Sequence, residues 1–205
     1  MLAPKPGERY TINRKVIPVA GNFRGGNRMF LKSGTLNALM KKAYKSGLAV
    51  GRTEDDWLYI AGSYWEVSIK REFVAKKTLG DIISLTGELP DPGTRFLATK
   101  EGNQIEMELP LRVDEEPFQK RDILTITDVL LIGTQGTVQR LLQDEQTGRI
   151  YPVNNVFVGI IDNAMIVRDK GEYEVQNPFF NPFHGILWAN NVCKLRAQFR
   201  SDEKN

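Results

Sequence analysis

The chain has few residues of the kinds that form disulfide bonds or bind soft metals. Its 205 residues include one cysteine, Cys193, and one histidine, His184. A single cysteine cannot form an internal disulfide bond, and these two residues cannot supply a Cys/His zinc cluster or a pair of histidine ligands. We therefore expect no metal site, no cofactor and a reducing, cytoplasmic setting.

Motifs for catalysis are equally scarce. His184 is the sole histidine for any Ser-His-Asp or Cys-His arrangement, and neither it nor Cys193 lies in a nucleophile motif. Two acidic triplets, residues 54–56 and 114–116, are interpreted as solvated turns, because neighbouring residues on a strand alternate faces and do not converge on one ion. We expect a protein that is not an enzyme. The least favoured alternative is a Mg²⁺-dependent enzyme that uses scattered carboxylates such as Asp122, Asp128, Asp144 and Glu145.

Long hydrophobic runs are missing as well. No run approaches the roughly 20 apolar residues of a membrane-spanning helix, and residues 1–6 lack the hydrophobic stretch of a signal peptide. Apolar residues make up 41% of the chain and charged residues 26%, which is ordinary for a globular protein. The sequence predicts no membrane span, and its length fits one ample domain or two small ones.

Acidic residues are almost absent from the first 52 positions. This region has eleven Lys or Arg and one acid, Glu8, whereas the remaining 153 residues have seventeen basic and twenty-four acidic side chains. The formal charge therefore divides into +10 and −7, although the whole chain is +3. Such a division indicates a partner that is a nucleic acid, an anionic surface or a charge-complementary protein.

The basic region begins with a predicted strand, residues 9–20, and a glycine-rich loop, residues 21–28. The loop lacks the Gly-Lys-Ser/Thr ending of a P-loop and the spacing of a dinucleotide fingerprint. Its glycines still allow close backbone approach to an anion, and Arg24 and Arg28 are suited to phosphate. Phe23 offers a face on which an unpaired base could stack.

The clearest predicted helix follows this loop. Ser33 or Thr35 is the expected N-cap, and Gly47 is expected to end the helix. One apolar face has helical spacing and consists of Leu36, Leu39, Met40, Ala43 and Tyr44. At 100° per residue, the opposite side presents three cations to solvent, namely Lys41, Lys42 and Lys45.

Later segments predict a hairpin, a second helix and a boundary. Residues 57–60 and 64–69 flank a tight turn. A helix over residues 79–86 is expected to be capped by Thr78 and stopped by Gly87. The Pro-rich residues 88–93 that follow suggest a division into a basic α+β region, 1–88, and a β-rich domain, 89–205, although one continuous domain fits equally.

The second half reads as β structure throughout. The predicted strands are residues 95–99, 104–109, 123–132, 137–142, 149–153, 156–161, 164–168 and 172–175. Residues 133–140 and 149–153 resemble the central hairpin of an SH3-like barrel. The predicted class is α+β: a mixed N-terminal region with two short helices and a hairpin, then a mainly antiparallel barrel or sandwich, SH3-like or OB-like.

An aromatic segment closes the β-rich half. Residues 177–188 hold three phenylalanines, a histidine and a tryptophan, with two prolines in the middle. We expect this segment to lead into a last strand and to join the core, because aromatic residues are mostly buried. The alternative is an exposed patch through which subunits associate.

Two kinds of function remain. The first is a non-enzymatic protein that binds DNA or RNA phosphates through its basic surface, whose predicted residues are Arg14, Lys15, Phe23, Arg24, Arg28, Lys32, Lys41, Lys42 and Lys45. The second is a structural or assembly protein, such as a component of a multi-subunit or virion-like particle. It would form a homo-oligomer or dock on an acidic protein through the charge division described above.

Overall fold

A computed structural model describes residues 31–108, 123–133, 136–162, 164–168, 185–190 and 192–198 of the chain. Their main feature is an antiparallel sheet of eight strands in the order β5-β4-β1-β2-β3-β11-β10-β9. These strands are β1 Leu48–Arg52, β2 Trp57–Gly62, β3 Trp65–Lys70, β4 Thr94–Thr99, β5 Gly102–Glu108, β9 Met165–Arg168, β10 Gly185–Ala189 and β11 Cys193–Gln198. The class is α+β as predicted, but this sheet is open rather than a closed barrel.

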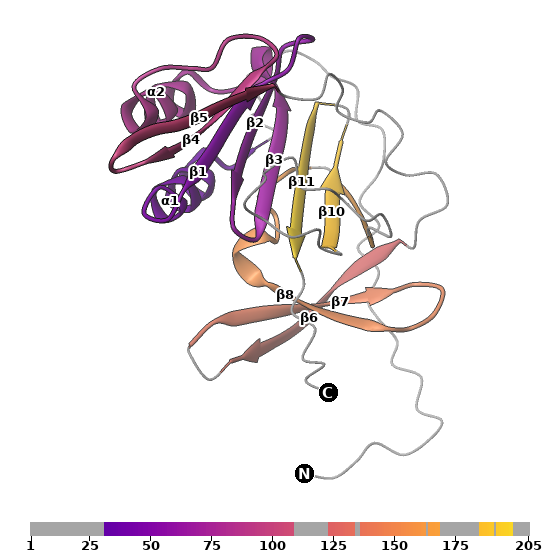
Figure 1. Cartoon of the computed structure of the whole chain (residues 1–205). Helices are drawn as coiled ribbons and strands as arrows, with labels where there is room; N and C mark the ends of the chain where they lie inside the picture. Colours follow the sequence, from indigo (N-terminus) through magenta and orange to yellow (C-terminus); the bar gives the residue numbers. More distant parts are fainter. Residues whose placement is uncertain are drawn as a thin grey trace, which may run out of the picture.

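Two helices, α1 Ser33–Ala43 and α2 Lys76–Thr86, cover one face of the large sheet (Figure 1). The strands alternate, so that Val50, Ile60 and Val67 lie on this helix-covered face and are fully buried. Leu36 and Met40 of α1 are fully buried in the same core. The apolar spacing that predicted α1 therefore faces the sheet, and Lys41, Lys42 and Lys45 are exposed as expected.

Both helix starts differ from the prediction. The N-cap position of α1 is Lys32, whose side chain makes no capping hydrogen bond, so neither Ser33 nor Thr35 occupies that position. In α2 the predicted cap, Thr78, is buried inside a helix that already begins at Lys76. The predicted helix ends agree better with the structure. Gly87 terminates α2 with a positive φ of 81°, and the backbone N–H of Gly47 donates to the carbonyl of Ala43 just beyond α1.

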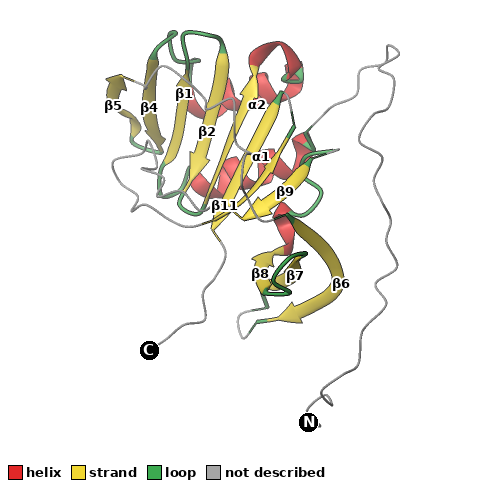
Figure 2. Cartoon of the chain, turned by 90° about the vertical axis from the view of Figure 1, so that its right-hand side faces the viewer, coloured by secondary structure: helices red, strands yellow, loops and turns green. Residues whose placement is uncertain are grey.

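A second, three-stranded sheet lies beside the large one and below it in both views (Figure 2). Its strands are β6 Leu124–Ile132, β7 Val138–Asp144 and β8 Ile150–Asn154, in that order. Leu124, Leu142 and Val153 are buried in the same core as α1 and the large sheet. The β7–β8 hairpin was predicted from the SH3-like spacing, and the structure confirms the hairpin.

The opposite face of the large sheet is also buried, but it carries polar groups. Glu66 on β3 and Arg196 on β11 form an ion pair of 2.6 Å between Oε1 and Nη1, with side chains only 9% and 11% exposed. The Tyr59 hydroxyl on β2 donates to the other carboxylate oxygen of Glu66 at 3.4 Å. Two chain segments about 130 residues apart are thus joined across this face by an ion pair as well as by strand pairing.

The end of the aromatic segment belongs to the core. Ile186, Leu187 and Trp188 lie in β10, between β9 and β11, and are at most 1% exposed. The core interpretation is confirmed for these residues, while residues 177–184 lie outside the described ranges.

Neither helix in the described part of the chain is long and apolar enough to cross a bilayer.

Candidate functional site

Three lysines gather at the C-terminal end of α1. Lys41 and Lys42 belong to the last turn of the helix and Lys45 follows it, and all three are exposed. None of them forms an ion pair with an acid among the described residues. The acid of α2 that reaches α1, Asp81, accepts a hydrogen bond from the Asn37 amide instead. We call Lys41, Lys42 and Lys45 the lysine cluster.

The acidic triplet of residues 54–56 lies away from the lysine cluster. It forms the turn between β1 and β2, whereas the cluster precedes the other end of β1. Five strand residues separate the two ends by about 16 Å. This exceeds the screening length of roughly 8 to 10 Å at physiological salt. The triplet therefore does not neutralise the cluster.

The other predicted contact residues are not part of this cluster. Lys32 is exposed, but it sits at the opposite end of α1, where its backbone N–H donates to the carbonyl of Ile160. Helix geometry places it about 15 Å from the cluster. The remaining predicted residues, Arg14, Lys15, Phe23, Arg24 and Arg28, lie outside the described residues.

Tyr64 is an exposed aromatic residue beside α1 that the sequence interpretation did not include. It occupies the β2–β3 turn and is 65% exposed. The same turn touches the end of α1, since a Cβ placed on Gly62 would lie 3.0 Å from the Cβ of Ala43. An aromatic residue inside a tight hairpin turn was the available signal, because a turn offers little surface on which to bury it.

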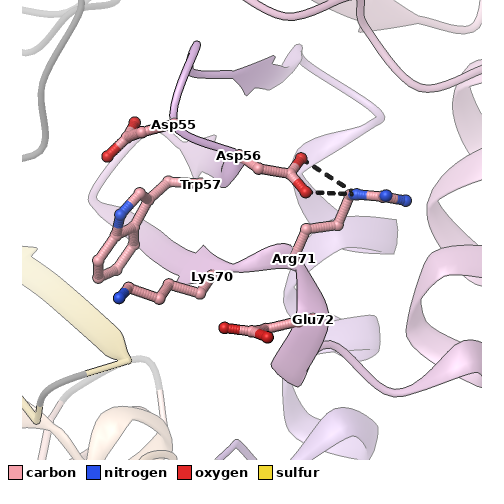
Figure 3. Close-up of a pocket in the computed structure, with 6 residues that line it drawn as sticks. All are labelled: Asp55, Asp56, Trp57, Lys70, Arg71 and Glu72. Carbon is pink, nitrogen blue, oxygen red and sulfur yellow. Dashed lines mark hydrogen bonds and ion pairs between the residues drawn. The ribbon is translucent and has the colours of Figure 1, made fainter.

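A shallow pocket of about 300 Å³ opens at the other end of β2 and β3 (Figure 3). Its lining residues are Asp55, Asp56, Trp57, Lys70, Arg71 and Glu72. Burial acts to raise the pKa of Asp56, but hydrogen bonds from Arg71 and Arg52 outweigh it and hold that pKa below its ordinary value. Asp56 is thus paired with two arginines, and the Lys70 ammonium lies over the Trp57 ring, 5.7 Å from its centroid.

Chemistry-bearing side chains do not converge elsewhere in the described ranges. No three His, Cys, Asp or Glu residues there are grouped as metal ligands. Cys193 is fully buried in β11, and its burial raises the pKa of its thiol, which disfavours the reactive thiolate. His184 lies outside the described residues.

Apolar side chains are exposed on the distal half of β6. Val129, Leu130, Leu131 and Ile132 are consecutive, and their exposed fractions run from 44% at Leu131 to 80% at Ile132. In the described part of the chain, β6 is an edge strand, with β7 on one side. Single exposed apolar residues are common on protein surfaces, but four in succession on a strand edge are not. We call residues 129–132 the apolar tip.

Known proteins add no constraint on these surfaces. No protein-family model, no curated protein and no solved structure matches the chain.

Proposed function

We propose that this protein is a non-enzymatic nucleic-acid-binding protein whose lysine cluster contacts backbone phosphates. The carrying observation is that Lys41, Lys42 and Lys45 lie together, exposed and without an acidic partner among the described residues. A rigid helix holds two of them, so their spacing is set by the fold. Ammonium groups so arranged favour phosphates with little preference for base sequence.

Tyr64 supports single-stranded nucleic acid over duplex. Tyr64 is exposed in the turn that follows Gly62, and Gly62 lies against Ala43 at the end of α1, so an unpaired base could stack on its ring while the lysines contact the adjoining backbone. Base stacking on an aromatic side chain is worth about 1 to 3 kcal/mol. In a duplex the bases already stack on each other, so Tyr64 has no such role there. The arginines and Phe23 of the glycine-rich loop remain a predicted extension of this surface.

The test is fluorescence anisotropy with single-stranded and duplex oligonucleotides over a salt series. K42E/K45E should weaken binding and make the slope of log affinity against log salt shallower by about 1.4 for single strands. K76E/K77E is the matched control, because it makes the same change in net charge at exposed lysines of α2. That control should lose less affinity and keep the slope. Equal effects of the two variants, or no binding by the wild type at low salt, would contradict the proposal.

Tyr64 gives an independent arm of the same experiment. Y64A should weaken single-strand binding roughly fivefold or more, with little effect on duplex, while Y64F should bind as the wild type does. Equal losses on both substrates would remove the stacking role and leave the phosphate contacts.

A second candidate function is assembly with other protein chains. The observation in its favour is the apolar tip of β6, which lies on the three-stranded sheet and not on the helix layer that carries the lysine cluster.

A further inference from the structure

Among the described residues, no strand pairs with the edge of β6 that faces away from β7. In the β6–β7 pair, the N–H of Gly133 donates to the carbonyl of Thr137 at 2.9 Å, which makes Ile132 and Val138 a non-hydrogen-bonded pair. Because antiparallel pairs alternate, Leu131 bonds to Gln139, while the backbone groups of Leu130 and Ile132 point away from β7. The apolar tip therefore combines exposed apolar side chains with two residues whose N–H and C=O face outward.

Polar contacts at a bulge hold the apolar tip in position. Three residues, 127–129, stand opposite Leu141 alone. The Thr127 hydroxyl donates to the carbonyl of Leu141 at 2.8 Å, and Arg140 donates to the carbonyl of Thr127 at 3.2 Å and to the Asn155 side chain. A bulge of this kind bends a strand and increases its twist. The direction of the tip is thus set by bonds behind it, and not by burial of the tip itself.

We propose that two copies of this chain associate through the apolar tip, with the β6 strands pairing antiparallel to form a continuous six-stranded sheet. This goes beyond the proposed nucleic-acid function and does not depend on it. The outward groups of Leu130 must meet those of Ile132 in the second copy, and the reverse. That requirement selects one register, in which Leu131 of one copy lies directly opposite Leu131 of the other.

A second copy fits this edge in charge as well as in hydrogen bonding. Asp128 is the single charged residue between Ile123 and Gly133. In the selected register the two Asp128 residues are offset by six positions, which is about 20 Å along the strand. No like charges therefore face each other, and apolar side chains meet apolar side chains on both faces of the new pair.

The area involved predicts a weak dimer. The pair would bury several hundred Å² in total, which is below the standard size of a stable interface. We expect a dissociation constant on the order of micromolar or weaker. This is an isologous contact with twofold symmetry, so it closes at the dimer and does not propagate into fibres.

Ile132→Pro tests the backbone pairing separately from apolar attraction. Proline removes an outward N–H that makes no bond to β7, so the β6–β7 ladder and the apolar character are both kept. In sedimentation velocity runs from low to high micromolar protein, the wild type should show a monomer–dimer equilibrium, and Ile132→Pro should weaken it at least tenfold. Ile83→Pro is unsuitable as a control because it would break α2; Ile83→Ser, at an exposed apolar site on α2, should leave the equilibrium unchanged.

Disulfide trapping tests the register. Leu131→Cys should form a covalent dimer on mild oxidation, because directly opposed, non-hydrogen-bonded residues have the Cα separation that a disulfide needs. Leu130→Cys alone should not form a covalent dimer, because position 130 of one copy and position 130 of the other lie two positions apart along the paired strands. A mixture of Leu130→Cys and Ile132→Cys should form a mixed covalent dimer, because position 130 of one copy lies opposite position 132 of the other. The native Cys193 is buried and should not interfere.

Three outcomes would overturn this inference. They are a wild type that stays monomeric at the highest concentration, an Ile132→Pro variant that dimerises as the wild type does, and a Leu131→Cys variant that is trapped no more than Ile83→Cys. A monomeric wild type would assign the apolar tip to a different protein. Circular dichroism of each variant establishes that it is folded, so loss of dimer cannot be confused with loss of structure.

Discussion

The buried ion pair between Glu66 and Arg196 is the best place to test how the large sheet is held together. Replacing Arg196 by Met keeps most of the side-chain volume but leaves the Glu66 carboxylate without its guanidinium partner, next to the Tyr59 hydroxyl at 3.4 Å. Breaking one partner of a buried pair typically costs about 3 to 5 kcal/mol. Because both side chains keep about a tenth of their surface exposed, we expect the lower end of that range.

A loss of about 3 kcal/mol should lower the Tm by roughly 6 to 12 °C in a chain of this size. The double variant Glu66→Gln/Arg196→Met should recover most of the loss, since it buries no uncompensated charge. A double-mutant cycle from urea denaturation should then give a coupling energy of about 2 to 3 kcal/mol.

A matched control is available at a more exposed pair. Arg52 and Asp56 have the same 2.6 Å separation, but their side chains are 24% and 43% exposed. Arg52→Met should therefore cost less than about 1 kcal/mol. The reasoning would be refuted if Arg52→Met and Arg196→Met were equally destabilising, or if the effects of Glu66→Gln and Arg196→Met simply added.

Three further predictions follow from single side chains. Burial and the nearby charge of Glu66 raise the pKa of Tyr59 well above its ordinary value. The contribution of Tyr59 to stability is therefore complete below the unfolded pKa of about 10 and is lost as the pH rises beyond it. The free energy of unfolding, measured as a function of alkaline pH, should fall less steeply in Tyr59→Phe than in the wild type. Buried Cys193 should react with a thiol reagent only on unfolding, at the rate measured by denaturation. Gly80→Ala in α2 should raise the free energy of unfolding by about 0.5 to 1 kcal/mol, whereas Gly87→Ala, at φ 81°, should lower it by about 1 kcal/mol; both sites are sterically open, so equal signs would contradict the backbone explanation.

Local periodicity was enough to find α1 and the β2–β3 hairpin. Leu36 and Met40 are four residues apart and point the same way in any helix, so their shared burial follows from the sequence. The start of α2 could not be found in this way. Thr78 has the side chain of a cap, but the helix begins two residues earlier and uses that position to bury Thr78 against the core.

The pairing of strands could not be predicted from the sequence, for a different reason. The central pairing of β3 with β11 joins residues 65–69 to residues 193–197, and nothing in either segment specifies the other. A run of eight short strands is compatible with a barrel, a sandwich or an open sheet, because each strand alternates in the same way in all three. The open sheet is identified by its length and by the helices on one face, and both features depend on contacts between residues distant in sequence.

The exposure of the apolar tip could not be predicted from the sequence, for a related reason. The sequence predicts a strand over residues 123–132, and an apolar run such as residues 129–132 is typical of a buried strand. The structure divides β6 instead: Leu124 is in the core, whereas the residues beyond the bulge are exposed. The bulge depends on contacts from Arg140 and the carbonyl of Leu141, so it cannot be recognised from β6 alone.

The lysine cluster and the apolar tip would act together in a dimer. Two paired copies carry two lysine clusters, so binding of one nucleic-acid chain to the first cluster makes its binding to the second intramolecular. A nucleic-acid chain that is long enough to reach both clusters therefore stabilises the dimer. By thermodynamic linkage, it raises the dimerisation constant by the same factor by which dimerisation raises the affinity for that chain. A short oligonucleotide reaches one cluster and leaves the monomer–dimer equilibrium unchanged. Dependence of dimerisation on oligonucleotide length is therefore expected when both surfaces work as inferred, and neither surface alone produces it.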